Sequence, residues 1–253
     1  MTANTPFHSA FGTDIGRRRS QNQDHGAARP ELGLFLVADG MGGHRGGETA
    51  SALAVEIVSD VVSQKIGDRR RSKVTPKEIL KEAIETANGR IYKTSAQQSE
   101  LQGMGTTTTA LLFDAATVTI GHVGDSRCYL IRADGIWQLT RDHSLVQEKL
   151  RAGLISREQL KTDRLKNVIT RSVGFEPHVQ VETYEMKTHP QDTFLLCSDG
   201  LSGLVEDREL LREVQTGVFE NKDLPGTVQR LIDLANEVGG DDNITVVLVQ
   251  VSK

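Results

Sequence analysis

Four aspartates stand beside short apolar runs of the chain, and carboxylates in such positions can hold metal ions. Three follow a run and one precedes a run: Asp39, Asp125, Asp199 and Asp242. The runs are typical of β-strands, and the ends of antiparallel strands can lie at one edge of a sheet. Crowded carboxylates repel one another unless cations neutralise them. A donor set made only of oxygen favours Mg²⁺ or Mn²⁺ over zinc. The pattern therefore predicts a divalent-metal site.

An Asp-Gly pair by itself is typical of a β-turn. Asp134-Gly135 lies between two β-type runs, at 129–132 and 136–139, and we interpret it as a hairpin turn without a ligand role. Asp39 and Asp199 are also followed by glycine. For them the recurrence of aspartate at four strand ends favours the metal interpretation.

A glycine-rich stretch at 40–47 joins Asp39 to the first predicted helix. It lacks the Gly-Lys-Ser/Thr of a P-loop, and Arg45 occupies the third glycine position of a dinucleotide-binding fingerprint. The glycines would instead let the backbone approach a metal, with the Gly40 carbonyl as a candidate ligand. His44 in this stretch is either a surface or packed histidine or a residue with a direct role.

Upstream, Arg19 precedes Asp24 by five residues. An arginine fork suits a two-pronged grip on phosphate oxygens. The alternative is that Arg19 belongs to a solvated basic run with Arg17 and Arg18.

The elements that must position these residues are of mixed type. Helical periodicity predicts helices at 48–64, at 76–91 after a Thr75 N-cap, and at 224–238. Strands do not alternate regularly with helices, so we expect an α+β domain of two mainly antiparallel sheets with helices outside. Residues 142–174 are expected to form an insertion that lies over the domain. The basic run at 69–73 is expected to be either a solvated loop or a docking patch. The predicted strands lie at 34–38, 106–113, 118–123, 128–131, 193–197 and 244–251.

Composition excludes several classes of function. The 253 residues carry a net charge of -4, which predicts no general attraction to nucleic acid or anionic lipid. There is no signal-like start and no apolar run of membrane-spanning length, so we expect a cytoplasmic protein without membrane contact. Cys128 and Cys197 lie in apolar runs and neither begins a Cys-x₅-Arg loop, which argues against a cysteine phosphatase.

Taken in order, the motifs resemble those of the metal-dependent (PPM, type 2C) protein phosphatases, with the bacterial branch as the closest match. The resemblance runs from about Thr13 to Val249. It implies one domain over 1–253 with an α-β-β-α sandwich, a mobile flap at 142–174, and hydrolysis of phosphoserine and phosphothreonine in proteins. The motifs are Arg19…Asn22-Gln23-Asp24, Val37-Ala38-Asp39-Gly40-Met41-Gly42-Gly43, Gly103-Met104-Gly105-Thr106-Thr107, His122-Val123-Gly124-Asp125-Ser126-Arg127, Cys197-Ser198-Asp199-Gly200-Leu201 and Asp242-Asn243-Ile244-Thr245-Val246.

The resemblance also implies roles for single residues. Asp39 would bridge two cations, and the Gly40 carbonyl would complete one of them. Asp199 and Asp242 would hold the other, and Asp125 with Asp199 a third, weaker Mn²⁺ or Mg²⁺.

The catalytic roles implied by the resemblance belong to the upstream residues. A hydroxide shared by two metals would attack phosphorus, with Asp24 orienting the water and Arg19 gripping the phosphate. Animal members have histidine, proposed as general acid, where this chain has Met41.

The partners implied are phosphoproteins, including a Ser/Thr kinase and its substrates. The protein itself is expected to be a monomer. Two alternatives stay open. One is a catalytically silent protein that binds phosphoproteins, and the other is a phosphatase dedicated to one regulatory protein such as an anti-sigma-factor antagonist.

Overall fold

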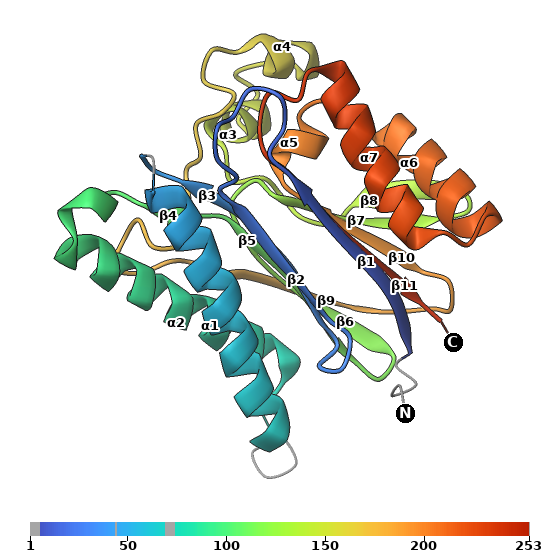
Figure 1. Cartoon of the computed structure of the whole chain (residues 1–253), viewed down its shortest axis with the longest axis horizontal. Coiled ribbons are helices and arrows are strands. Elements are labelled where there is room, and N and C mark those ends of the chain that lie inside the picture. Colours follow the sequence, from blue (N-terminus) through green and yellow to red (C-terminus); the bar gives the residue numbers. More distant parts are fainter. Residues whose placement is uncertain (1–5, 44, 69–73, 253) are drawn as a thin grey trace.

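The computed structural model describes residues 6–43, 45–68 and 74–252, and Figure 1 shows their arrangement. His44 and the basic run at 69–73 lie outside the described residues. None of the described helices combines the length and the apolar character needed to cross a membrane.

Two antiparallel sheets form the centre of the molecule (Figure 1). The first sheet has the order β1 (Phe7–Asp14), β11 (Ile244–Val251), β10 (Thr193–Cys197), β7 (Arg127–Arg132) and β8 (Gly135–Gln138). The second has the order β2 (Asp24–Arg29), β3 (Leu34–Met41), β5 (Thr108–Asp114), β6 (Thr117–Val123) and β9 (Glu182–Lys187), and the short β4 (Gly105–Thr106) pairs with β3.

Helices cover the outer face of each sheet (Figure 1). The second sheet carries α1 (Gly46–Asp68) and α2 (Pro76–Gln97), which is followed by a 3-10 turn (Ser99–Leu101). The first sheet carries α5 (Asp199–Ser202), α6 (Asp207–Val214), a π-helical turn (Gln215–Glu220) and α7 (Leu224–Val238). The short α3 (Leu145–Arg151) and α4 (Arg157–Thr162) lie at one end of the sandwich. This arrangement confirms the predicted α-β-β-α sandwich.

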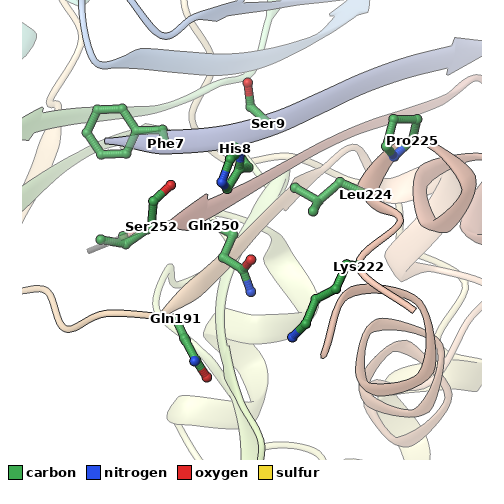
Figure 2. A pocket seen from close by; sticks show the side chains of 10 residues that line it. Phe7, His8, Ser9, Gln191, Lys222, Leu224, Pro225, Gln250 and Ser252 are labelled. Carbon is green, nitrogen blue, oxygen red and sulfur yellow. The ribbon is translucent and has the colours of Figure 1, made fainter. Parts of the chain in front are cut away.

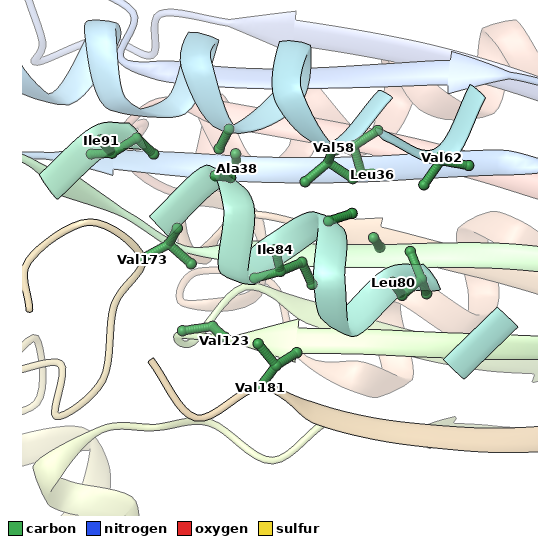
Figure 3. Close-up of a cluster of buried hydrophobic side chains, with 14 of the residues drawn as sticks. Leu36, Ala38, Val58, Val62, Leu80, Ile84, Ile91, Val123, Val173 and Val181 are labelled. Atoms are coloured by element: carbon green, nitrogen blue, oxygen red, sulfur yellow. The ribbon is translucent and has the colours of Figure 1, made fainter. Parts of the chain in front are cut away.

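Three apolar layers hold the sandwich together. The first joins α1 and α2 to the second sheet and includes Val58, Ile84 and Leu36 (Figure 3). The layer between the sheets contains edge-to-face aromatic pairs, such as Phe113 and Phe194 with ring centroids 5.5 Å apart. The third joins α5, α6 and α7 to the first sheet. Each large apolar side chain buried in these layers contributes about 1.5–3 kcal/mol of transfer free energy.

The three predicted helices are present, but α1 and α2 extend beyond the predicted ranges 48–64 and 76–91. The Thr75 side chain accepts a hydrogen bond from the Glu78 N–H, and the Glu78 carboxylate accepts one from the Thr75 N–H. Together these two bonds form the predicted capping box. The helix predicted at 224–238 has those bounds.

The strand that carries the first metal-ligand candidate is longer than predicted. β3 does not end at Ala38 but continues through Asp39 and Gly40, because β4 pairs with Gly40 and Met41. Strands β1, β2 and β9 were not predicted. Each has several partly exposed positions, so its apolar pattern is weaker than that of a buried strand.

Candidate active site

The structure brings the four predicted metal-ligand aspartates to one end of the sandwich. Asp39 lies in β3, Asp125 in the turn after β6, Asp199 at the start of α5 and Asp242 just before β11. The negative charges of the other three all act on Asp39, as does that of Asp24, its cross-strand partner in β2. The predicted convergence is therefore present.

Burial and mutual repulsion change the pKa values of these carboxyl groups. Burial, followed by the charges of Asp24 and Asp199, raises the pKa of Asp39 well above its usual value. Burial and the charge of Asp199 raise the pKa of Asp125 to about 8. Burial and the charge of Asp242 raise the pKa of Asp199. The cluster therefore holds more negative charge than its own surroundings neutralise.

Two carboxylate oxygens in the cluster lack a protein partner. Oδ1 of Asp125 and Oδ1 of Asp199 are buried, and neither accepts a hydrogen bond from the described residues. Buried acceptors are almost always satisfied in native proteins. A pair of unsatisfied carboxylate oxygens among carboxyl groups with raised pKa values fits a divalent cation.

The cluster is open rather than a closed cage. Within 6–43, 45–68 and 74–252, no three Asp, Glu, His or Cys side chains form a group that could hold a metal ion by themselves. Mg²⁺ usually keeps several waters and takes only one or two protein carboxylates. An open set of carboxylates suits that kind of coordination better than the closed site of a structural zinc.

Arg19 lies beside the cluster and forms an ion pair with Asp242. Its Nη2 lies 2.5 Å from Oδ2 of Asp242, and this hydrogen bond raises the pKa of Arg19. About half of the Arg19 side chain is exposed. Exposed ion pairs contribute little free energy, so Arg19 can leave Asp242 for another anion at small cost.

Asp24 is buried beside the cluster and is held by two hydroxyl groups. Ser198 Oγ donates to its Oδ2 at 2.7 Å, and the Thr245 hydroxyl also bonds to it. Burial raises the pKa of Asp24 to about 7 even though both bonds oppose the shift. Ser198 and Thr245 were not singled out from the sequence. The available signal was their position within the motifs around Asp199 and Asp242.

Gly40 has no space for a side chain. A Cβ on Gly40 would lie 2.1 Å from the carbonyl oxygen of Gly47 and 2.6 Å from that of Gln23. The sequence interpretation related this glycine to a metal, but the crowding comes from the protein itself, because the first turn of α1 packs directly on β3. At Gly43, by contrast, a Cβ would have no other atom within 4 Å.

Two further polar residues fix the backbone around the site. Thr107 Oγ1 accepts from the Asp39 amide at 2.9 Å. Asn243 Oδ1 accepts from the Gln23 amide at 2.8 Å, and its Nδ2 donates to the Ile15 carbonyl. Sequence reasoning gave neither residue a role. All three bonds join segments far apart in the chain, so no local pattern indicates them.

The residues interpreted as structural are placed accordingly. Asp134 lies in the turn between β7 and β8, where Arg132 pairs with Gly135, as predicted for a hairpin. Cys128 and Cys197 are buried and reduced. Burial raises the pKa of the Cys197 thiol to about 12, so it is protonated at neutral pH and is a poor nucleophile.

A cavity of about 670 Å³ adjoins the carboxylate cluster. Asp125 and Asp199 line it, as do Ser144 and Leu160 from the segment that contains α3 and α4. A second cavity of about 710 Å³ lies at the other end of β11, beside Lys222 and Gln191 (Figure 2). Because none of the cluster aspartates lines the second cavity, we place the chemistry at the first.

A two-sheet sandwich with an open cluster of partly buried carboxyl groups and a nearby arginine defines the class of metal-dependent phosphatases. Comparison with known proteins supports this class. Residues 11–236 match the family described as protein phosphatase 2C. The chain is 40% identical to the serine/threonine phosphatase stp of Listeria innocua, with 96% of each chain covered.

Solved structures of similar proteins have the same fold. The serine/threonine phosphatase PstP/Ppp of Mycobacterium tuberculosis superposes with a TM-score of 0.87 at 32% identity, over 98% of this chain and 99% of that one. The catalytic domain of PstP in complex with two manganese ions gives a TM-score of 0.84 at 32% identity, with the same shares covered.

The chain therefore belongs to the protein phosphatase 2C family. It is a metal-dependent protein serine/threonine phosphatase that uses manganese or magnesium.

Proposed function

We propose that this end of the sandwich removes phosphate from phosphoserine and phosphothreonine, with two cations in the core site and a third, weaker one. Asp39 would hold both ions of the core pair, and the Gly40 carbonyl would complete one of them. Asp199 and Asp242 would hold the other, and Asp125 with Asp199 would hold the weaker ion. The observation that carries this assignment is the pair of partnerless buried oxygens on Asp125 and Asp199 within a cluster of raised pKa values.

Bound Mn²⁺ or Mg²⁺ supplies an activated water as nucleophile and neutralises charge on the phosphoryl oxygens. The side chains of the protein orient the attacking water and hold the phosphate of the substrate. Arg19 exchanges its bond to Asp242 for one to the phosphate of the substrate, which its exposure permits. Asp24, held by the hydroxyl groups of Ser198 and Thr245, orients the attacking water. Met41 cannot supply a proton to the leaving group.

We also propose a single phosphatase domain over 1–253, in which 142–174 form the flap, and a cytoplasmic monomer. Its substrates include a Ser/Thr kinase and the proteins which that kinase phosphorylates. The buried, reduced cysteines support a reducing compartment. The silent-binding alternative would require loss of metal ligands, and all the proposed ligands are present.

Metal titration tests the ligand assignment. Protein treated with EDTA is expected to lose activity toward a phosphothreonine peptide and to regain it with Mn²⁺ or Mg²⁺. Calorimetry should resolve a tight and a weak phase of Mn²⁺ binding, and Asp125→Asn should weaken the second phase alone. Full activity in metal-free protein, or with zinc alone, would contradict the proposal.

Arg19→Ala is expected to lower kcat/KM about ten- to a hundredfold. The substitution removes a charge-assisted contact worth roughly 1.5–3 kcal/mol, and about 1.4 kcal/mol corresponds to a factor of ten. The loss should appear partly in KM, while Mn²⁺ affinity should hardly change. Arg17→Ala is the matched control, because the Arg17 side chain is exposed and has no partner among the described residues. Equal losses in both variants would show that only diffuse positive charge matters.

A further inference from the structure

Both ends of the flap (142–174) meet the body of the protein at His143. The backbone N–H of His143 donates to the Gly124 carbonyl at 2.8 Å, in the turn that carries Asp125. The backbone carbonyl of His143 accepts from the N–H of Thr170 at 2.8 Å, near the far end of the flap. One residue therefore contacts the turn beside the site and both ends of the flap.

The imidazole of His143 makes a second bond to the same turn. The Gly124 N–H donates to His143 Nδ1 at 3.0 Å. A backbone amide can only donate, so Nδ1 carries no proton and the ring proton is on Nε2. Nε2 lies 3.1 Å from a carboxylate oxygen of Glu182 in β9, which accepts a hydrogen bond from the Nε2–H group. Arg171 Nη1 also lies 3.1 Å from Nε2, and it donates to the Gln180 carbonyl at 3.2 Å. Only 5% of the His143 side chain is exposed, and burial lowers its pKa, which keeps the ring neutral.

A second histidine, His122, packs against the imidazole of His143 and helps to hold its orientation. The two ring centroids lie 4.8 Å apart. His122 is itself fixed by Thr109 Oγ1 at 2.9 Å from Nδ1 and by the Arg141 carbonyl at 3.1 Å from Nε2. Burial lowers the pKa of His122 to about 4, so two neutral rings stack without repulsion.

The turn that carries Asp125 has room only for glycine at position 124. Gly124 has φ +110°, and a Cβ there would lie 2.5 Å from the Thr107 side chain. Oδ1 of Asp125 has no partner among the described residues, so bonds of its own do not fix that oxygen. The position of the carboxylate therefore depends on the backbone of the turn, which His143 holds through both the N–H and the carbonyl of Gly124.

We propose that His143 is a positioning residue whose Nδ1 fixes the Gly124–Asp125 turn and thereby couples the flap to cation binding at Asp125. The inference rests on the proposed role of Asp125 as a ligand of the weak ion. Coupling of this kind is reciprocal: an ion at Asp125 stabilises the flap in its present position, and displacement of the flap weakens the ion. Since Asp125 and Ser144 line the same cavity, the coupling also reaches the space open to substrate.

Two substitutions distinguish the role of Nδ1 of His143 from that of Nε2. His143→Asn keeps an acceptor close to the place of Nδ1, whereas His143→Gln places its amide nearer the place of Nε2 and leaves the Gly124 N–H without its acceptor. Glu182→Gln removes the charge beside Nε2 and leaves the bond from Gly124 intact. The measurements are the weak phase of Mn²⁺ activation with an aryl phosphate, and the ¹⁵N–¹H signal and exchange rate of the Gly124 amide in the Mg²⁺-loaded protein.

His143→Gln is expected to raise the Mn²⁺ concentration for half-activation in the weak phase about tenfold, the size typical for partners that orient a metal ligand. The Gly124 amide should also exchange faster. His143→Asn and Glu182→Gln should both stay near the wild type. A shift of the same size in His143→Asn and His143→Gln, or an unchanged Gly124 signal in His143→Gln, would overturn the proposal.

The outcomes also separate this inference from the proposed function. If Asp125→Asn leaves the weak phase unchanged, the ligand assignment itself is wrong. If Asp125→Asn weakens that phase and His143→Gln does not, only the positioning role falls. Should His143→Gln fail to fold, the ring ¹⁵N shifts of His143 in the wild type decide, because they must change as Mg²⁺ fills the weak site. Constant shifts would overturn the coupling.

Discussion

Asp39→Asn is expected to lose nearly all turnover and, without metal, to unfold at a higher temperature than the wild type. The loss of kcat should reach at least about 10²–10³-fold, as when one electrostatic stabiliser of a transition state is removed. The gain in stability follows because desolvation and the charges of four other aspartates raise the pKa of the half-buried Asp39. An amide of the same shape removes the charge and keeps the packing.

The sign of the pH dependence follows from that raised pKa. A carboxyl group with a folded pKa above its unfolded value stabilises the fold at low pH, and this contribution is lost as the pH rises through the folded pKa. The advantage of Asp39→Asn in metal-free protein should therefore be larger at pH 8 than at pH 5. At pH 8 we expect a rise in Tm of at least about 2–4 °C, equivalent to roughly 1 kcal/mol in a chain of this size.

Bound metal should make the wild type more stable than Asp39→Asn, the reverse of the order without metal. The reason is that a ligand that binds only the folded state raises Tm by mass action. With excess Mn²⁺ the wild type should unfold at the higher temperature. Asp134→Asn is the matched control, since Asp134 lies in the β7–β8 turn away from the cluster, and it should change neither activity nor metal response. A well-folded Asp134→Asn enzyme without activity, beside an active Asp39→Asn enzyme, would refute the site.

Gly40→Ala is expected to impair both stability and activity. The added Cβ would lie 2.1 Å from the Gly47 carbonyl oxygen, which belongs to the backbone of α1 and cannot rotate away. Overpacking of this kind costs roughly 1–3 kcal/mol or more, which should lower Tm by about 2–12 °C. The displacement would also move Asp39 and the Gly40 carbonyl, so Mn²⁺ affinity by calorimetry and kcat should fall together.

Gly43→Ala distinguishes this steric effect from a general need for glycine in the stretch at 40–47. A Cβ at Gly43 meets nothing within 4 Å, so Tm and activity should stay close to the wild type. If both alanine variants behave alike, the close packing of β3 against α1 is not what selects glycine at position 40.

Several features of this protein follow from the sequence alone because their causes are local. The capping box of α2 lies within four residues, and the helix at 224–238 follows from its apolar period and its flanking residues. The core strands β10 and β11 are buried along their whole length, and their apolar runs therefore reveal them. The carboxylate types and their places beside strands predict the class of metal, because ligand chemistry depends on residue type.

The tertiary structure alone decided how these residues are held. Arg19 meets Asp242 across 223 positions of the chain, and Ser198 meets Asp24 across 174. His143 reaches Gly124 only because the flap returns to the turn after β6. Strands β1 and β2 are recognisable only once their partners β11 and β3 are in place, since their own side chains are partly exposed. Such contacts depend on which distant segments the two sheets and their apolar layers bring together, and no local pattern of residues encodes that pairing.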